Sequence, residues 1–171
     1  IYVRVRIRYP RLFNEQVSFE GFGEIVLYDD EDELFCLNNS LTLRIDTYYS
    51  SNYYLSDKSQ GTYGPYHAVL QDEIYSSYEE AYMIAEELNE EFKVEFYPYL
   101  IEDGYIIAGG NFADKSSSQD LAEELNDEGY NAESMNGNLE NIIAYNKKNI
   151  PVFMYKKDMP VYFSSYNQDE E

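Results

Sequence analysis

The chain of 171 residues contains no tryptophan, one cysteine and one histidine. Cys36 has no second cysteine with which to form an internal disulfide, and its place in the apolar stretch LFCL predicts a small buried thiol. His67 has no second histidine or cysteine with which to share a metal ion, so we predict no metal site. No run of eighteen apolar residues is present, and we therefore predict no membrane insertion of this chain.

Positive charge is also scarce, because 12 Lys and Arg residues face 33 Asp and Glu residues and the net charge is −21. Proteins that bind nucleic acids rely on basic side chains that neutralise phosphates. Anionic membrane surfaces attract basic segments for the same reason. The charge therefore predicts no nucleic-acid partner, and it disfavours RNA binding even for a sheet that carries aromatic residues.

Motifs that would indicate catalysis or a cofactor are missing too. The acidic stretch DDEDE at 29–33 lacks the alternating Asp pattern and the Gly of a calcium loop, so we interpret it as a solvated turn. No serine elbow and no phosphate-binding loop with its lysine is present. Carboxylates are so frequent that a pair of them identifies no acid–base site. We predict no cofactor and no catalytic residue.

A repeated pentapeptide is the clearest positive feature. AEELN occurs at 85–89 and again at 122–126, 37 residues later, which is a spacing typical of repeated supersecondary units. Around it the same helical pattern of small and apolar residues recurs, at Ala81, Ile84, Ala85 and Leu88 and at Ser118, Leu121, Ala122 and Leu125. The sequence therefore predicts two similar amphipathic helices.

Each predicted helix lies between two β-prone stretches. HAVL at 67–70 and KVEFYPYL at 93–100 flank the first, and GYII at 104–107 and YNAESM at 130–135 flank the second. Ser77 with Glu80 and, in the second helix, Asp114 are predicted N-caps, and Gly129 is a predicted C-terminal stop. The pattern predicts an α+β fold with βαββαβ order, an antiparallel sheet and both helices on one face.

The flanking regions indicate β structure on both sides of the repeat. Strict alternation in 1–9 and the runs EIVLY and LTLRIDTYY, separated by DDEDE and NNS, predict strands in a β-rich segment at 1–60. The stretch 50–65 is rich in Ser, Gly and Asn and predicts a linker. We predict a central unit at 61–138 and, from NIIAYN, IPVFMY and PVYF, a β-hairpin segment at 139–171 that packs with the N-terminal strands.

One part of the central unit resembles a known family. The segment YIIAGGNFADKSSSQDLAEELNDEGYNAESM at 105–135 has a strand, a Gly two residues before an aromatic, a Ser/Asp turn, an Ala/Leu-rich helix and then Gly-Tyr-x-Ala. It resembles the second half of a SPOR (sporulation-related repeat) domain. The first half, 66–97, is less similar, because Glu73 stands where the family has Gly. The resemblance covers roughly 63–137.

The surrounding sequence resembles the N-terminal region of stage II sporulation protein D-like, or amidase-enhancer-like, proteins, on VRVRIRYPRLFNEQVSFEGFGEI and the junction GPYHAVL…YSSYEEA. The catalytic Glu stretch of their lytic transglycosylase domain has no match here, so this resemblance implies no such activity in this chain. It implies a cell-envelope location outside the cytoplasm and binding of peptidoglycan glycan strands. Because the chain starts within a strand-like pattern and stops at NQDEE, we expect it to be part of a longer protein.

Strand parity assigns candidate glycan-binding residues to the sheet face without helices. If Ala68, Leu70, Val94, Phe96 and Ile107 face the helices, the opposite face carries His67, Val69, Gln71, Glu95, Tyr97, Tyr99 and Ile106, with Met135 beside them. Tyr97 and Tyr99 would stack on sugar rings, while their hydroxyls, Gln71 and His67 would form hydrogen bonds with the substituents of the ring.

An alternative stays open, because flanking β residues 140–165 would cover the same tyrosines. The chain would then be a structural or regulatory insertion that contacts its own catalytic domain or another cell-wall protein without binding glycan.

Overall fold

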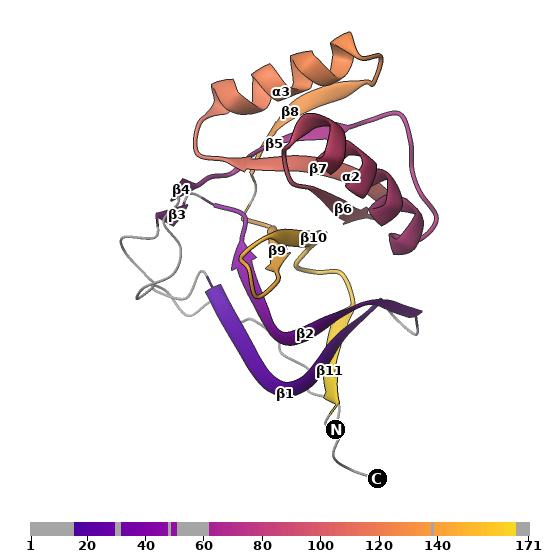
Figure 1. The fold of residues 1–171 in the computed structure, drawn as a ribbon, viewed down its shortest axis with the longest axis vertical. Helices are drawn as coiled ribbons and strands as arrows, with labels where there is room; N and C mark the ends of the chain where they lie inside the picture. The colour runs from indigo at the N-terminus through magenta and orange to yellow at the C-terminus, as the bar shows by residue number, and fades with distance from the viewer. Residues whose placement is uncertain (1–15, 30–31, 48, 51–61, 138, 167–171) are drawn as a thin grey trace.

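The structure is a computed structural model that describes residues 16–29, 32–47, 49–50, 62–137 and 139–166 (Figure 1). Its elements are β1 (Gln16–Asp29), β2 (Asp32–Ile45), β3 (Tyr49–Ser50), β4 (Thr62–Tyr63), β5 (Tyr66–Leu70), α2 (Tyr78–Phe92), β6 (Phe96–Ile101), β7 (Gly104–Phe112), α3 (Lys115–Asp127), β8 (Ala132–Asn136), β9 (Asn141–Tyr145), β10 (Pro151–Lys156) and β11 (Val161–Tyr166). The strand predicted at 1–9 and most of the linker predicted at 50–65 lie outside the described residues.

Nine strands form one sheet in the order β11-β1-β2-β9-β10-β6-β7-β5-β8, and β3 pairs with β4 separately. Neighbouring strands in the large sheet are antiparallel except for β10 and β6, which run parallel. The predicted α+β class, with a mostly antiparallel sheet and two helices, is confirmed.

Both helices pack on the same face of the sheet. Small and apolar residues at helical spacing, among them Ala81, Ala85 and Leu88 of α2 and Leu121 and Leu125 of α3, are buried against this face. Strand residues that parity assigned to the helix side join them, with Ala68, Leu70, Phe96 and Ile107 in the same core and Val94 packed against it. That part of the parity prediction is confirmed.

The predicted helix ends are confirmed by their hydrogen bonds. Ser77 Oγ accepts from the backbone N–H of Glu80, and Asp114 Oδ1 accepts from that of Ser117. Gly129 has φ of 97°, a left-handed conformation that glycine adopts without strain, and follows α3.

The flanking strands extend the sheet of the repeated segment. β9 pairs with β2 on one side and with β10 on the other, and β10 pairs with β6. β11 pairs with the other side of the β1–β2 hairpin. Figure 1 shows α2 and α3 at one end of the molecule, the long β1 and β2 ribbon at the other, and β9 and β10 between them.

The NNS stretch at 38–40 does not separate two strands as predicted, because β2 runs through it. Its partner strand has a register shift between Glu20 and Glu24, opposite this stretch. A bulge of this kind accommodates an irregular, polar stretch without ending the strand pair.

The sheet is strongly curled. Asp46, directly after β2, contacts His67 of β5, although β9, β10, β6 and β7 lie between β2 and β5 in the sheet order. The curl gives the sheet an inner face and, on its other side, the helix face. Within the described residues no helix is long and apolar enough to cross a membrane.

Candidate functional site

The candidate glycan-binding residues lie on the predicted side of the sheet, but most are covered. Tyr97 is 1% and Tyr99 6% exposed. Also buried are His67, Val69 and Ile106, whereas Met135 is half-buried and Gln71 and Glu95 are exposed. In the part of the chain that the structure describes, Tyr97 and Tyr99 therefore form no exposed platform on the inner face of the sheet.

The cover comes from strands that follow the repeat. Ile143 and Tyr145 of β9 and Met154 of β10 form one apolar cluster with Tyr97 and Tyr99. These residues lie within the segment 140–165. The two tyrosines are therefore covered by the segment that the alternative prediction named. The physical reason is the curl of the sheet, which brings the apolar inner faces of neighbouring strands together and removes them from water.

His67 lies at the centre of a buried hydrogen-bond network rather than on a surface. Its Nε2 is 2.8 Å from Asp46 Oδ1, and both side chains are fully buried. An ionised carboxylate only accepts hydrogen bonds, so Nε2 donates. Nδ1 is 2.9 Å from the Gly110 carbonyl oxygen and 2.9 Å from the Tyr97 hydroxyl, which itself donates to Gly110 at 2.8 Å.

The network continues away from His67 to other buried polar groups. Asn141 Nδ2 donates to Asp46 Oδ2 at 3.4 Å, and the Tyr99 hydroxyl donates to Asn141 Oδ1 at 3.2 Å. Burial raises the pKa of Tyr97 well above that of a free tyrosine, with smaller contributions from Tyr145 and Asp46. The hydroxyls that were predicted to bond sugars therefore bond protein groups, and we name the set of His67, Asp46, Tyr97, Gly110 and Asn141 the inner network.

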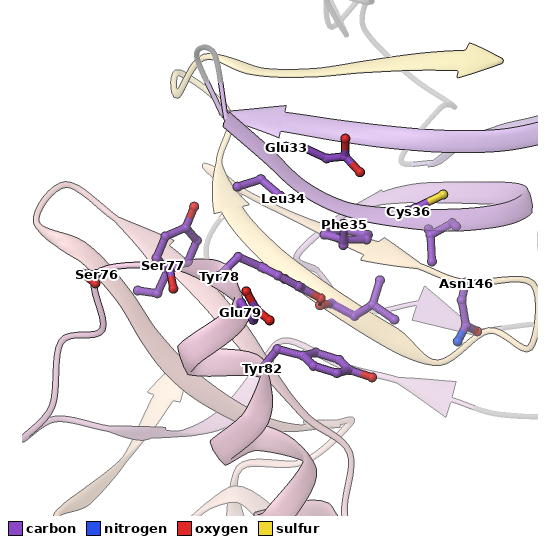
Figure 2. Close-up of a pocket in the computed structure, with 13 residues that line it drawn as sticks. Glu33, Leu34, Phe35, Cys36, Ser76, Ser77, Tyr78, Glu79, Tyr82 and Asn146 are labelled. Carbon is purple, nitrogen blue, oxygen red and sulfur yellow. Dashed lines mark hydrogen bonds between the residues drawn. The ribbon is translucent and has the colours of Figure 1, made fainter.

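A solvent-open groove lies on the helix face, between β2 and the start of α2 (Figure 2). Its volume is about 770 Å³, within the range typical of small-ligand sites. The lining residues are Glu33, Leu34, Phe35, Cys36, Leu37, Ser76, Ser77, Tyr78, Glu79, Tyr82, Tyr105, Asn146 and Val152.

Three aromatic rings form one wall of the groove. Phe35 stacks on Tyr78 with ring centroids 4.7 Å apart and planes at 24°, and Tyr78 stacks on Tyr82 at 5.7 Å and 20°. The Tyr78 hydroxyl donates to the Val152 carbonyl at 3.1 Å, which fixes the middle ring. Tyr82, the outermost ring, is 39% exposed. The stack therefore leads from the core to a ring whose surface is open to a ligand.

The first turn of α2 places polar groups beside these rings. Glu80 Oε2 accepts hydrogen bonds from the backbone N–H and the hydroxyl of Ser76, at 3.1 and 2.8 Å. With the Ser77 cap, these bonds hold the start of the helix in one conformation. Because Tyr78 and Tyr82 are four residues apart in this helix, their side chains point to the same side of α2, as Figure 2 shows.

The groove is negatively charged. Its lining contains Glu33 and Glu79 and no Lys, Arg or His. Partial desolvation raises the pKa of the Cys36 thiol, and the charges of Glu24 and Glu33 raise it further. Burial, followed by Glu86, likewise raises the pKa of Tyr82. Cys36 is exposed in this lining, which corrects the prediction of a buried thiol: it lies on the polar side of β2, opposite the side that carries Phe35.

The arrangement suits binding of a polar ligand with a flat apolar face. Tyr82 offers a ring face, and Ser76, Ser77, Glu33 and Glu79 offer hydroxyls and carboxylates. Among the described residues no group of three or more His, Cys, Asp or Glu side chains is arranged to hold a metal ion.

Sequence reasoning missed this groove. The spacing of Tyr78 and Tyr82 on a predicted helix was a usable signal, since residues four apart share a helix face. That Phe35 and Glu33 line the same groove could not be predicted from the sequence, because it depends on a contact between segments more than forty residues apart.

No protein-family model, no curated protein and no solved structure matches this chain.

Proposed function

We propose that the chain is a non-catalytic module that binds peptidoglycan glycan strands in the groove between β2 and α2. The observation that carries the proposal is the stack of Phe35, Tyr78 and Tyr82, which ends in an open ring face beside hydroxyls and carboxylates. Sugar rings pair an apolar face with polar edges, and amphipathic aromatic side chains suit such ligands.

In this proposal residues 66–136 are a SPOR-like βαββαβ unit. The observed order β5, α2, β6, β7, α3, β8, with the strands arranged β6-β7-β5-β8, supports it. The unit would act outside the cytoplasm, at the cell wall, and would hold an attached lytic domain close to its substrate. The site differs from the one predicted from strand parity, since most of the residues on that sheet face are covered and the groove takes over its role.

The test is co-sedimentation of the purified chain with intact peptidoglycan and with amidase-treated peptidoglycan that lacks stem peptides. We expect stronger pelleting with the stripped material and a loss of about tenfold in affinity for Tyr82→Ala, because an open stacking ring typically contributes 1–3 kcal/mol. Met83→Ala is the matched control, since Met83 is an exposed neighbour on α2 that does not line the groove. Pelleting that is absent, or unaffected by Tyr82→Ala, would contradict the proposal.

A second candidate function is protein–protein contact without glycan binding. It is favoured by large apolar side chains that are exposed before α2, on α2 and before β9, which are Ile74, Met83 and Leu139. The same experiment separates the two, since this candidate requires that the chain pellets with neither form of peptidoglycan.

A further inference from the structure

Asn146, the residue that follows β9, brings an oriented hydrogen-bond donor to the lining of the groove. Its side-chain Oδ1 accepts hydrogen bonds from the backbone N–H groups of Lys148 and Ile150, at 2.9 and 3.1 Å. An amide oxygen has two lone pairs, and these two donors occupy both. They also fix which end of the amide is the oxygen, because the reverse orientation would turn an NH2 group toward two N–H donors. The side chain therefore offers a ligand its donors and no acceptor.

The turn after β9 holds this amide in place. The backbone N–H of Asn146 donates to the Ile150 carbonyl at 3.0 Å, and that of Asn149 donates to the Asn146 carbonyl at 2.9 Å. Within the described residues Asn146 Nδ2 has no protein partner, and Figure 2 shows this nitrogen on the side of Asn146 toward Tyr82. A ligand that displaces water from Nδ2 must supply an acceptor, because a donor left without a partner costs free energy.

Hydrogen bonds connect Asn146 to the aromatic stack. Ile150, which bonds to Asn146 through both its N–H and its carbonyl, lies two residues before Val152. The Val152 carbonyl accepts from the Tyr78 hydroxyl at 3.1 Å. Because an extended chain rises about 3.3 Å per residue, these links keep the Asn146 amide within about 15 Å of the Tyr78 hydroxyl. A short oligosaccharide that lies along the groove can therefore contact both the rings and the amide.

The rest of the lining determines which acceptor suits Asn146. The lining residues that the structure describes include no Lys, Arg or His, so a carboxylate of the glycan would find no positive charge there. A protonated amine has only donors, and would face the donors of Nδ2. A sugar hydroxyl accepts, but it carries a proton that needs an acceptor of its own, and both lone pairs of Oδ1 are taken. A neutral carbonyl oxygen needs only the donor.

We propose that Asn146 donates to the carbonyl oxygen of an N-acetyl group and thereby makes the groove selective for glycan whose hexosamine units are acetylated. One sugar ring of the strand lies on the open face of Tyr82, and an acetamido group of the same strand reaches Asn146 Nδ2. This inference rests on the proposed function, since it names the chemical group that the same groove recognises.

The test compares a tetramer of N-acetylglucosamine with cellotetraose, which has the same linkage and a hydroxyl in place of each acetamido group. By calorimetry we expect the natural chain to bind the acetylated tetramer about five- to tenfold more tightly, the effect of one neutral hydrogen bond. In Asn146→Asp the side chain still accepts from Lys148 and Ile150 but no longer donates, so this ratio should fall to about one. The matched control is Gln119→Glu, which adds the same charge at an exposed position of α3 outside the groove and should preserve the ratio.

A second measurement follows the donor in the natural chain and does not depend on how the variant folds. The side-chain NH2 signals of Asn146 in a heteronuclear NMR spectrum should shift when the acetylated tetramer is added and should stay in place with cellotetraose. They are identified by their loss in Asn146→Asp, whose unfolding midpoint in urea should stay close to that of the natural chain because the bonds of the turn remain.

The other outcomes separate the inference from the proposed function. Equal affinity for the two tetramers, or a preference that survives Asn146→Asp, would overturn the inference. Glycan binding in the groove would still stand if Tyr82→Ala weakened the binding of both tetramers. Binding of neither tetramer, together with no pelleting on peptidoglycan, would overturn the inference and the proposed function.

Discussion

Tyr97 and Tyr145, on the inner face of the curled sheet, are each 1% exposed, whereas Tyr82, at the mouth of the groove on the helix face, is 39% exposed. The two clusters are built from the same kind of residue. They differ in what the hydroxyls contact. The Tyr97 hydroxyl bonds Gly110 and His67 in the core, whereas that of Tyr82 bonds Glu86 at the surface. The comparison teaches that abundance of tyrosine marks both cores and binding surfaces, and that neighbouring strands decide between them.

The inner network pairs the polar groups that the curl of the sheet buries. Asp46 and His67 are both without exposure to water, and such groups persist in a core only when each finds a partner. Gly110, with φ of 74°, lets the chain present its carbonyl to His67 and Tyr97. The inner network therefore holds β5, β6 and β7 against the end of β2 and stabilises the curl.

The largest effect should follow from breaking this network. His67→Ala leaves the buried Asp46 carboxylate without the imidazole, and we expect a loss of about 3–5 kcal/mol in the free energy of unfolding. Urea unfolding monitored by tyrosine fluorescence measures it. Met83→Ala, at an exposed position, should change stability by less than about 0.5 kcal/mol. A loss below about 1 kcal/mol for His67→Ala would show that the network does not support the curl.

Deleting one hydroxyl from each cluster sharpens the comparison. Tyr97→Phe removes the donor to Gly110 and a partner of His67 in the core, so we expect a loss of about 1–3 kcal/mol. Tyr82→Phe removes a hydroxyl whose hydrogen bond with Glu86 lies at the surface, where water can take its place, so the change should stay within about 0.5 kcal/mol. Equal losses in the two variants would mean that the clusters do not differ in the way their exposure indicates.

Local patterns in the sequence predicted the elements between 66 and 136 well. Helix faces, caps and strand parity follow from residues three or four apart or alternating, and Ala85, Ser77 and Tyr97 all lie where these rules place them. The α+β class follows from the same patterns.

The exposure of a strand face could not be predicted in the same way. Whether Tyr97 is covered depends on β9 and β10, which approach it only because β10 pairs with β6 in parallel. The contact between Asp46 and His67 and the groove between Phe35 and Tyr78 also depend on long-range pairing. No local periodicity encodes such contacts, which depend on the curl of the whole sheet.

A smaller effect should appear in the reactivity of Cys36. Its pKa is raised from 9.0 by partial desolvation and then by Glu24 and Glu33, so less of the nucleophilic thiolate is present at neutral pH than for a free cysteine. Glu33→Gln should increase the rate of alkylation by iodoacetamide at neutral pH about two- to threefold. Glu90→Gln, outside the groove, is the control and should leave the rate unchanged. An unchanged rate in Glu33→Gln would indicate that the groove is less negative than its lining implies.

The smallest effect concerns a cap that belongs to neither cluster. Hydrogen bonds from Ser116 and Ser117 lower the pKa of Asp114 below its ordinary value of 3.8. A carboxyl group whose pKa is lower in the folded chain stabilises the fold above the unfolded pKa, and this contribution is lost as the pH falls through the folded value. The stability difference between the natural chain and Asp114→Asn should therefore be constant from pH 7 to about pH 5 and should shrink below about pH 4. Urea unfolding across this range measures it, and Asp120→Asn, which removes the same charge from α3 without touching the cap, controls for net charge. A difference that persists undiminished at about pH 3 would mean that the ionised carboxylate is not what holds the first turn of α3.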